Sequence, residues 1–251
     1  MRALYTALLT AAFILAGTQA GLAAATLQNG EMTYESGGKK TVFTGDDVAV
    51  QTIKGSDLVF LTLDEDPAKR IGKGPTLFVF DASGALAAET SAIPDVDIEQ
   101  ISALSLSPKG GILAVDNGTW VVRSWSFVTY PALAPVGKPV AYLTDEDLQD
   151  LVWVNDDAVL VTVINENSGR KCADYDPCSP RSVALHRIST GTTTPVLAGT
   201  DVCDYGLTGF DGKSVTAIKT CGKTAKDWAS ADSKEKGLTR SKESAPLPDK
   251  F

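Results

Sequence analysis

The sequence predicts an all-β protein, namely a β-propeller-like array of about four blades with four strands each. Short apolar runs rich in β-branched residues alternate with turn residues along most of the chain. The clearest turns fall near residues 57, 109, 156 and 211, so they are 52, 47 and 55 residues apart. A repeat of about fifty residues is typical of propeller blades. A β-sandwich is the alternative, because the strand count and the turn spacing fit that fold as well.

Residues 1–25 have the three-part layout of a secretory signal peptide. Arg2 supplies the positive start, residues 7–16 form an apolar run, and small residues follow up to Ala25. The run is shorter than the roughly 20 residues that a membrane-spanning helix needs. We therefore expect cleavage before Thr26 and a secreted or periplasmic protein with no membrane span after cleavage. A retained membrane anchor is the alternative interpretation.

Hairpin signals follow one another through residues 26–221, which we assign to one propeller-like domain. The pair Gly37-Gly38 separates two extended runs, and such a pair is a strong signal for a tight turn. Four further strand-like runs fall between Asp47 and Thr90. They complete the first repeat.

The next three repeats each open with a hairpin. The second begins with LSLSPKGGILAV at Leu104, where a proline and two glycines make the turn. The third contains DLVWVNDDAVLVTV from Asp150, with its turn at 155–157. The fourth begins with VCDYGLTGFDGKSVTAIKT at Val202 and turns at Asp211-Gly212.

The two ends of the array predict how it closes. The fourth repeat has two apolar runs before the composition changes, and the chain begins with two runs that lack partners. We expect the N-terminal strands to complete the last blade, because closure leaves no exposed sheet edge. Residues 222–251 are highly charged and contain few apolar residues, so we expect a flexible charged tail, with at most a short docked strand around Trp228.

Four cysteines fit an oxidising compartment and allow three pairings. Residues that pair across the turn at 211–212 should have numbers that sum to about 423, and those of Cys203 and Cys221 sum to 424. We expect a disulfide between these two, and a second between Cys172 and Cys178 within the loop CADYDPC. Loop-closure entropy predicts that each bridge adds about 2–3 kcal/mol of stability.

Two of the hairpins resemble those of known propellers. The segment from Leu104 is similar to the strand–SPDG–strand hairpin of TolB-type propellers, with Lys109 in place of the usual aspartate. The segment from Asp150 resembles hairpins in the propeller domains of prolyl-oligopeptidase-type serine peptidases, through Trp153 and the turn 155–157. The resemblance implies a blade and no activity, because these peptidases carry their catalysis in a separate α/β-hydrolase domain that nothing in this chain matches.

The residues that could carry chemistry form no catalytic motif. The chain has no G-x-S-x-G nucleophile elbow, and His186 is its one histidine. We interpret His186 as a blade residue that faces a groove or solvent rather than as a catalytic base, because no partner motif accompanies it. Acid-rich stretches at 64–67, 95–97 and 144–150 lack EF-hand spacing, and the cysteines lack zinc-ligand spacing. We therefore expect no metal, no cofactor and no catalytic residues.

Aromatic residues cluster in TWVVRSWSFVTY from Thr119. Strand alternation places Arg123 and Trp125 on one face and Trp120 on the other. We interpret the cluster as core between blades. The alternative is an exposed patch of Trp120, Arg123, Trp125 and Tyr130 that contacts a partner.

The formal net charge of −8 disfavours nucleic acid and anionic lipid as partners. Our functional hypothesis is a secreted or periplasmic binding or scaffold protein, whose partner is another protein with a basic surface. Two alternatives stay open. One is an enzyme with a carboxylate or metal site at the channel mouth, and the other is a remnant of a peptidase propeller domain.

Overall fold

A computed structural model shows an all-β protein made of antiparallel sheets, with one short helix among the residues that it describes. The described residues are 24–28, 31–36, 38–43, 48–53, 56–61, 77–80, 85–90, 103–118, 123–143, 145, 147–164, 179–230 and 238–248. The chain divides into two compact units. The first comprises residues 1–100 with 131–133, and the second comprises 101–130 with 134–251.

The first unit holds two sheets, A and B. Sheet A has the order β1 (Ala24–Gln28), β2 (Glu31–Ser36), β3 (Lys39–Phe43). Sheet B has the order β4 (Val48–Ile53), β5 (Ser56–Leu61), β6 (Leu77–Phe80), β7 (Leu86–Thr90). Met32 and Tyr34 of β2 share an apolar cluster with Phe78 and Phe80 of β6. These contacts hold the two sheets against each other.

The second unit holds three sheets, C, D and E. Sheet C contains β8 (Ala103–Leu106), β9 (Ile112–Gly118), β10 (Arg123–Thr129) and β11 (Val140–Tyr142), paired in that order. Sheet D contains β12 (Val152–Asn155), β13 (Ala158–Ile164), β14 (Arg181–Arg187) and β15 (Thr192–Leu197), again in chain order. Sheet E contains β16 (Cys203–Phe210), β17 (Ser214–Cys221) and β18 (Thr239–Pro246).

The turns predicted from sequence for the second unit lie where they were expected. The SPKGG segment at 107–111 joins β8 to β9, residues 156–157 join β12 to β13, and residues 211–213 join β16 to β17. Gly212 has a φ of +93°, which a residue with a side chain rarely adopts. Local turn chemistry therefore fixed these three hairpins.

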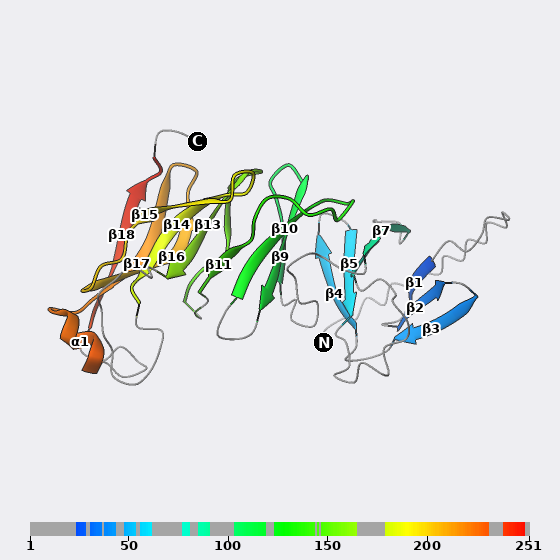
Figure 1. Ribbon diagram of the computed structural model, residues 1–251, viewed down its shortest axis with the longest axis horizontal. Helices are drawn as coiled ribbons and strands as arrows, with labels where there is room; N and C mark the ends of the chain where they lie inside the picture. The colour runs from blue at the N-terminus through cyan, green and yellow to red at the C-terminus, as the bar shows by residue number, and fades with distance from the viewer. Residues whose placement is uncertain are drawn as a thin grey trace, which may run out of the picture. The chain divides into compact units, whose positions relative to one another are not determined.

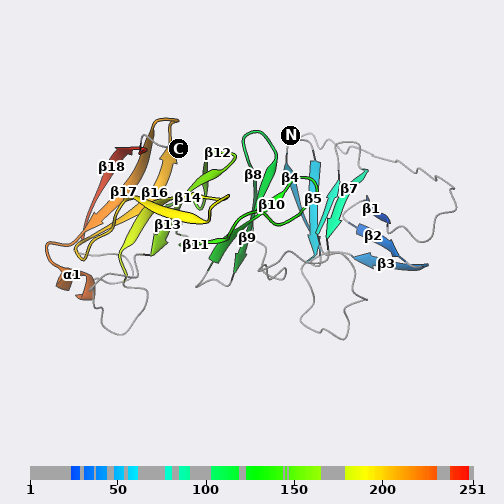
Figure 2. The same ribbon diagram turned by 45° about the horizontal axis from the view of Figure 1, so that its top comes forward.

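Sheet D is buried on both faces, because sheets C and E pack on opposite sides of it (Figures 1 and 2). Along β13, Val159 and Val161 share a cluster with side chains of sheet C, among them Trp125. The alternate residues Ala158 and Leu160 share a second cluster with side chains of sheet E. Because successive side chains of β13 point to opposite faces, this strand contributes to both apolar clusters.

Polar contacts add to this apolar packing between sheets C and D. The Trp153 indole N–H donates to Ser105 Oγ at 2.9 Å. The backbone N–H of Lys109 donates to Asp156 Oδ1 at 2.8 Å, and its ammonium lies 3.6 Å from Asp156 Oδ2. The backbone N–H bond is the main reason that the pKa of Asp156 lies below its ordinary value. Lys109 therefore ties the turn of one hairpin to the turn of the next.

The C-terminal region corrects two expectations. β18, rather than the N-terminal strands, pairs along β17, in register from Ser214↔Pro246 to Cys221↔Thr239, and β1–β3 form a sheet of their own. The segment expected to be a flexible tail also contains α1 (Ala225–Ser230), a helix where we expected at most a strand. An edge strand such as β18 is held mainly by backbone hydrogen bonds, so its polar sequence is no obstacle to docking.

The expected signal segment lies mostly outside the described residues, which begin at Ala24. Within the described part of the chain, the structure contains no helix long and apolar enough to cross a membrane. Ala25, which cleavage before Thr26 would remove, belongs to β1 and is buried in the cluster between sheets A and B.

Candidate functional site

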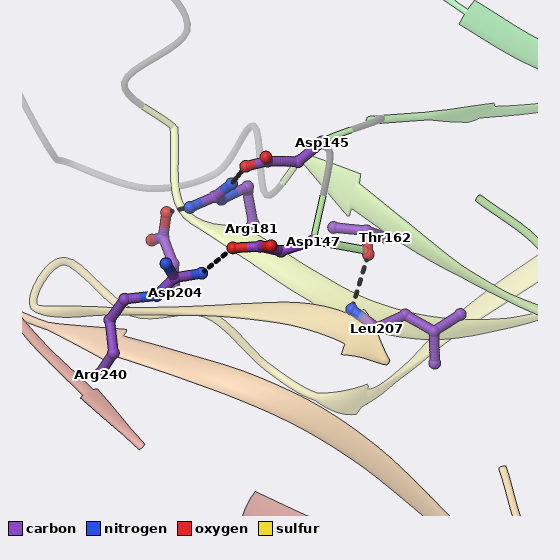
Figure 3. A network of polar contacts seen from close by, with 7 residues as sticks. All are labelled: Asp145, Asp147, Thr162, Arg181, Asp204, Leu207 and Arg240. Carbon is purple, nitrogen blue, oxygen red and sulfur yellow. Dashed lines mark hydrogen bonds and ion pairs between the residues drawn. The ribbon is translucent and has the colours of Figure 1, made fainter. Parts of the chain in front are cut away.

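Five charged residues from distant parts of the chain meet where sheets D and E adjoin (Figure 3). Arg181 begins β14, and its guanidinium lies 3.1 Å from Asp204 of β16 and 3.3 Å from Asp145. Arg240 of β18 lies 3.2 Å from Asp147. Three carboxylates and two guanidinium groups therefore form one end of the second unit. We refer to these five residues as the ionic cluster.

The loop between β11 and β12 places two of its three aspartates, Asp145 and Asp147, in the ionic cluster. It is anchored to sheet D where the Leu143 N–H donates to the Thr162 carbonyl at 2.9 Å. It is anchored to sheet E where the Gln149 N–H donates to the Leu207 carbonyl at 2.8 Å. Between these points, Leu148 lies directly over Gly206, where an added Cβ would come within 2.5 Å of its side chain. Glycine at 206 thus allows the loop to lie close to β16.

The two halves of the ionic cluster have different environments. Asp204 is 4% exposed, so its charge depends on Arg181 and its other protein partners for compensation. Removing one member of such a buried pair typically costs about 3–5 kcal/mol. Asp147 and Arg240 are 62% and 47% exposed, and pairs of this kind contribute about 0–1 kcal/mol. The Arg181–Asp204 pair, the buried half, therefore has a structural role. The Asp147–Arg240 pair, the exposed half, can exchange its contacts for those of a ligand.

An open groove of about 520 Å³ lies beside the exposed half, on the face of sheet E that is turned away from sheet D. It is lined by Asp147, Thr208, Thr216, Ile218, Arg240 and Lys242. A smaller cavity of about 10 Å³, enough for one water molecule, lies between the ionic cluster and Thr220. The groove offers two cations, one carboxylate that is paired with Arg240, hydroxyl groups and one apolar side chain, so its lining has one excess positive charge, at Lys242, and suits an anionic or polar ligand.

His186 is a core residue, so the expectation that it faces a groove or solvent is wrong. It is 1% exposed, and its ring stacks on that of Phe127 with 5.7 Å between centroids. Nδ1 lies 2.9 Å from the Thr193 hydroxyl and Nε2 lies 3.1 Å from the Lys138 carbonyl, which can only accept. The neutral ring therefore carries its proton on Nε2 and accepts at Nδ1. Burial lowers its pKa, while the Lys138 carbonyl and Asp157 oppose that shift.

The alternative interpretation, an exposed partner patch, does not hold for Trp125. Trp125 is 2% exposed, stacks on Tyr142 at 5.6 Å, and donates its indole N–H to the Asp150 carbonyl. Arg123 forms an ion pair with the buried Asp116. Tyr130 is half-buried, and Trp120 lies outside the described residues. The interpretation as core between sheets is therefore correct for Trp125.

The same region leaves three buried side-chain oxygen atoms without a hydrogen-bond partner among the described residues. They are the hydroxyls of Ser126 and Tyr142 and Oδ1 of Asp150. The pKa of Tyr142 is raised, mainly because the phenol is buried and also because the Asp150 carboxylate is near. The phenol therefore remains protonated and keeps a hydrogen to donate.

The cysteine prediction is tested for one of its two pairs. Cys203 and Cys221 form a disulfide with an S–S distance of 2.05 Å, and they face each other in the β16–β17 register. Cys172 and Cys178 lie outside the described residues, as do the acid-rich stretches 64–67 and 95–97. Among the described residues, no group of three or more histidine, cysteine, aspartate or glutamate side chains could hold a metal ion.

Sequence reasoning missed the ionic cluster, although it noted the acids at 144–150. Arg181 lies 23 residues from Asp204 and 36 from Asp145, and Arg240 lies 93 residues from Asp147. No local spacing connects such residues.

Comparisons with known proteins find only weak structural similarity. No family model matches the chain, and no curated protein is similar to it in sequence. A structure from a study of two prolyl endopeptidases aligns with a TM-score of 0.38 and 16% identity, over 91% of this chain and 28% of that one. A structure described as the eukaryotic initiation factor aligns with a TM-score of 0.39 and 11% identity, over 82% of this chain and 52% of the other.

TolB from Acinetobacter baumannii aligns with a TM-score of 0.26 and 12% identity, over 90% of this chain and 63% of TolB. This chain therefore spans less than two thirds of the length of each of these structures. With TM-scores below 0.5, none of these likenesses bears on the function of this chain.

Proposed function

We propose that this chain is a secreted or periplasmic protein that acts by binding another protein. Its scaffold is a propeller-like array of stacked sheets, and its contact site is the groove on sheet E with the exposed half of the ionic cluster. The observation that carries the proposal is the groove itself, which combines an open volume with charged side chains held in place by paired strands.

The packing of the second unit supports a propeller-like scaffold. A sandwich buries one face of each of two sheets, whereas sheet D is buried on both faces between sheets C and E. Sheets B, C and D are each four-stranded and antiparallel with neighbours in chain order, which is the topology of a blade. The disulfide at the open end of β16 and β17 supports an oxidising compartment.

The partner should carry a basic surface, because the chain has a net charge of −8. Net charge acts at long range and accelerates the encounter of oppositely charged proteins. This argument concerns the rate of association. The lifetime of the complex depends on the contacts in the groove.

The experiment uses the exported protein as bait in a periplasmic extract, followed by mass spectrometry. A parallel bait carries Arg240→Gln and Lys242→Gln, which neutralise the groove. We expect a partner that the native bait retains and the neutralised bait loses, with an association rate that falls as ionic strength rises from low to physiological. A partner set identical for both baits, or a measured turnover by the chain alone, would replace this proposal with one of its alternatives.

A further inference from the structure

Sheet E is one strand shorter than sheets B, C and D, as far as the described residues show. Its outermost strand, β18, pairs with β17 along eight residues on one side. No described strand pairs with the other side. Such an edge presents backbone N–H and C=O groups to any extended segment that approaches it.

The side chains of β18 divide by face. Lys242 is opposite Ile218 and Arg240 is opposite Thr220, so both cations lie on the face that forms the groove. Glu243 is directed to the other face, where its carboxylate lies 2.9 Å from the Lys219 ammonium, and Ala245 packs against the core between sheets D and E. The acidic side chain of the strand is thus neutralised on one face, and both cations lie on the other face, where Arg240 is paired with Asp147.

We propose that the edge of β18 receives an extended segment of the partner protein, with acidic side chains at every second position. Such a segment would extend sheet E by one strand through backbone hydrogen bonds. Its alternate side chains would fall on the groove face, because neighbouring residues of a strand point to opposite faces. There they would meet Arg240 and Lys242 as cross-strand neighbours of opposite charge.

The charge of the groove selects this occupant. The chain is acidic overall, yet the groove-facing side chains of β18 include two cations two residues apart. Arg240 is already paired with Asp147, so Lys242 supplies the excess positive charge. A basic segment would place like charge beside Lys242, whereas carboxylates at alternate positions would complement it and could share Arg240 with Asp147. The inference rests on the proposed binding function and specifies the part of the partner that enters the groove.

The test uses synthetic peptides and the whole exported protein, so it does not depend on knowing the partner. One peptide alternates glutamate with valine or threonine, and a second has the same composition with its glutamates adjacent. Fluorescence anisotropy gives the affinities, and hydrogen exchange reports on the amides of β18. We expect the alternating peptide to bind at least tenfold more tightly, a difference of about 1.4 kcal/mol, and to protect amides of β18 from exchange.

Two variants complete the design. Arg240→Gln with Lys242→Gln should weaken the affinity for the alternating peptide at least tenfold. Lys223→Gln with Lys226→Gln removes the same charge from exposed positions near α1 and should leave the affinity unchanged. The melting temperature of each variant is measured first. If the double variant is destabilised, Lys242→Gln alone replaces it in the binding assay, because this substitution leaves the Arg240–Asp147 pair intact.

Equal affinities for the two peptides, binding without protection of β18, or no binding at all would overturn the inference. In each case lysine and proline at this edge would simply protect it from aggregation. A partner captured by the native bait alone would still uphold the binding function after such a failure. Peptide binding without any captured partner would instead uphold the edge site and count against the proposed function.

Discussion

The contact between Thr162 and Leu207 offers a sharp test of how sheets D and E are joined. The backbone N–H of Leu207 donates to Thr162 Oγ1 at 2.9 Å, and both residues are fully buried (Figure 3). The bond runs from one sheet to the next, so no strand pairing replaces it. Substituting Thr162→Val keeps the shape of the side chain and removes the acceptor.

The expected cost follows from two opposing effects. A buried N–H left without an acceptor costs about 1–3 kcal/mol. Replacing a hydroxyl by a methyl group in an apolar site returns about 0.8 kcal/mol. We therefore expect a net loss of about 0.2–2.2 kcal/mol. For a chain of this size, each kcal/mol lowers the melting temperature by roughly 2–4 °C.

The assay is thermal and urea unfolding of the exported protein, with hydrogen exchange at the Leu207 amide as the specific readout. Thr162→Ser keeps the oxygen and should leave that amide protected, although it removes a buried methyl group. Thr194→Val lies at an exposed position of β15 and should change stability by less than about 0.5 kcal/mol. If Thr162→Val left both the melting temperature and the exchange rate of the Leu207 amide unchanged, the hydrogen bond from Leu207 to Thr162 would not join sheets D and E as we describe.

Two further predictions concern the disulfide and the histidine. Replacing Cys203 and Cys221 by serine should lower stability by about 3 kcal/mol, measured by urea unfolding, because the bridge closes a loop of 18 residues; an unchanged midpoint would contradict this. His186 is the one histidine of the chain, and its folded pKa is lowered by burial, so the unfolded chain binds the proton first as pH falls below about 6.5. Stability should therefore decline from about pH 7.5 to pH 5.5, and the decline should be smaller in His186→Gln; equal slopes for the two proteins would count against it.

The hairpins of the second unit were predictable because their turns are encoded locally. Proline and glycine at 108–111, asparagine and aspartate at 155–157, and Asp211-Gly212 each favour a tight turn whatever surrounds them. The pairing of Cys203 with Cys221 followed from the last of these turns, because a hairpin register is fixed once its turn is placed. Local chemistry thus gave three hairpins and one bridge.

The ionic cluster and β18 were not predictable in this way. TRSKESAP has no apolar alternation, because an edge strand is held mainly by backbone hydrogen bonds rather than by buried side chains. Low hydrophobicity therefore indicated disorder, and tertiary pairing with β17 overrode it. Once β18 was assigned to a flexible tail, nothing in the sequence could bring Arg240 to Asp147.

The weak apolar anchoring of β18 has a consequence for binding at the groove. Of its side chains, Ala245 packs against the core, and the strand is otherwise held by its ladder with β17 and by ion pairs at its surface. Segments of this kind detach at a lower free energy than core strands. A ligand that contacts Arg240 and Lys242 binds the docked form and therefore stabilises it. Docking of β18 and occupancy of the groove are thus thermodynamically coupled, and a change that lowers the docked fraction of the strand weakens ligand binding in proportion to that fraction.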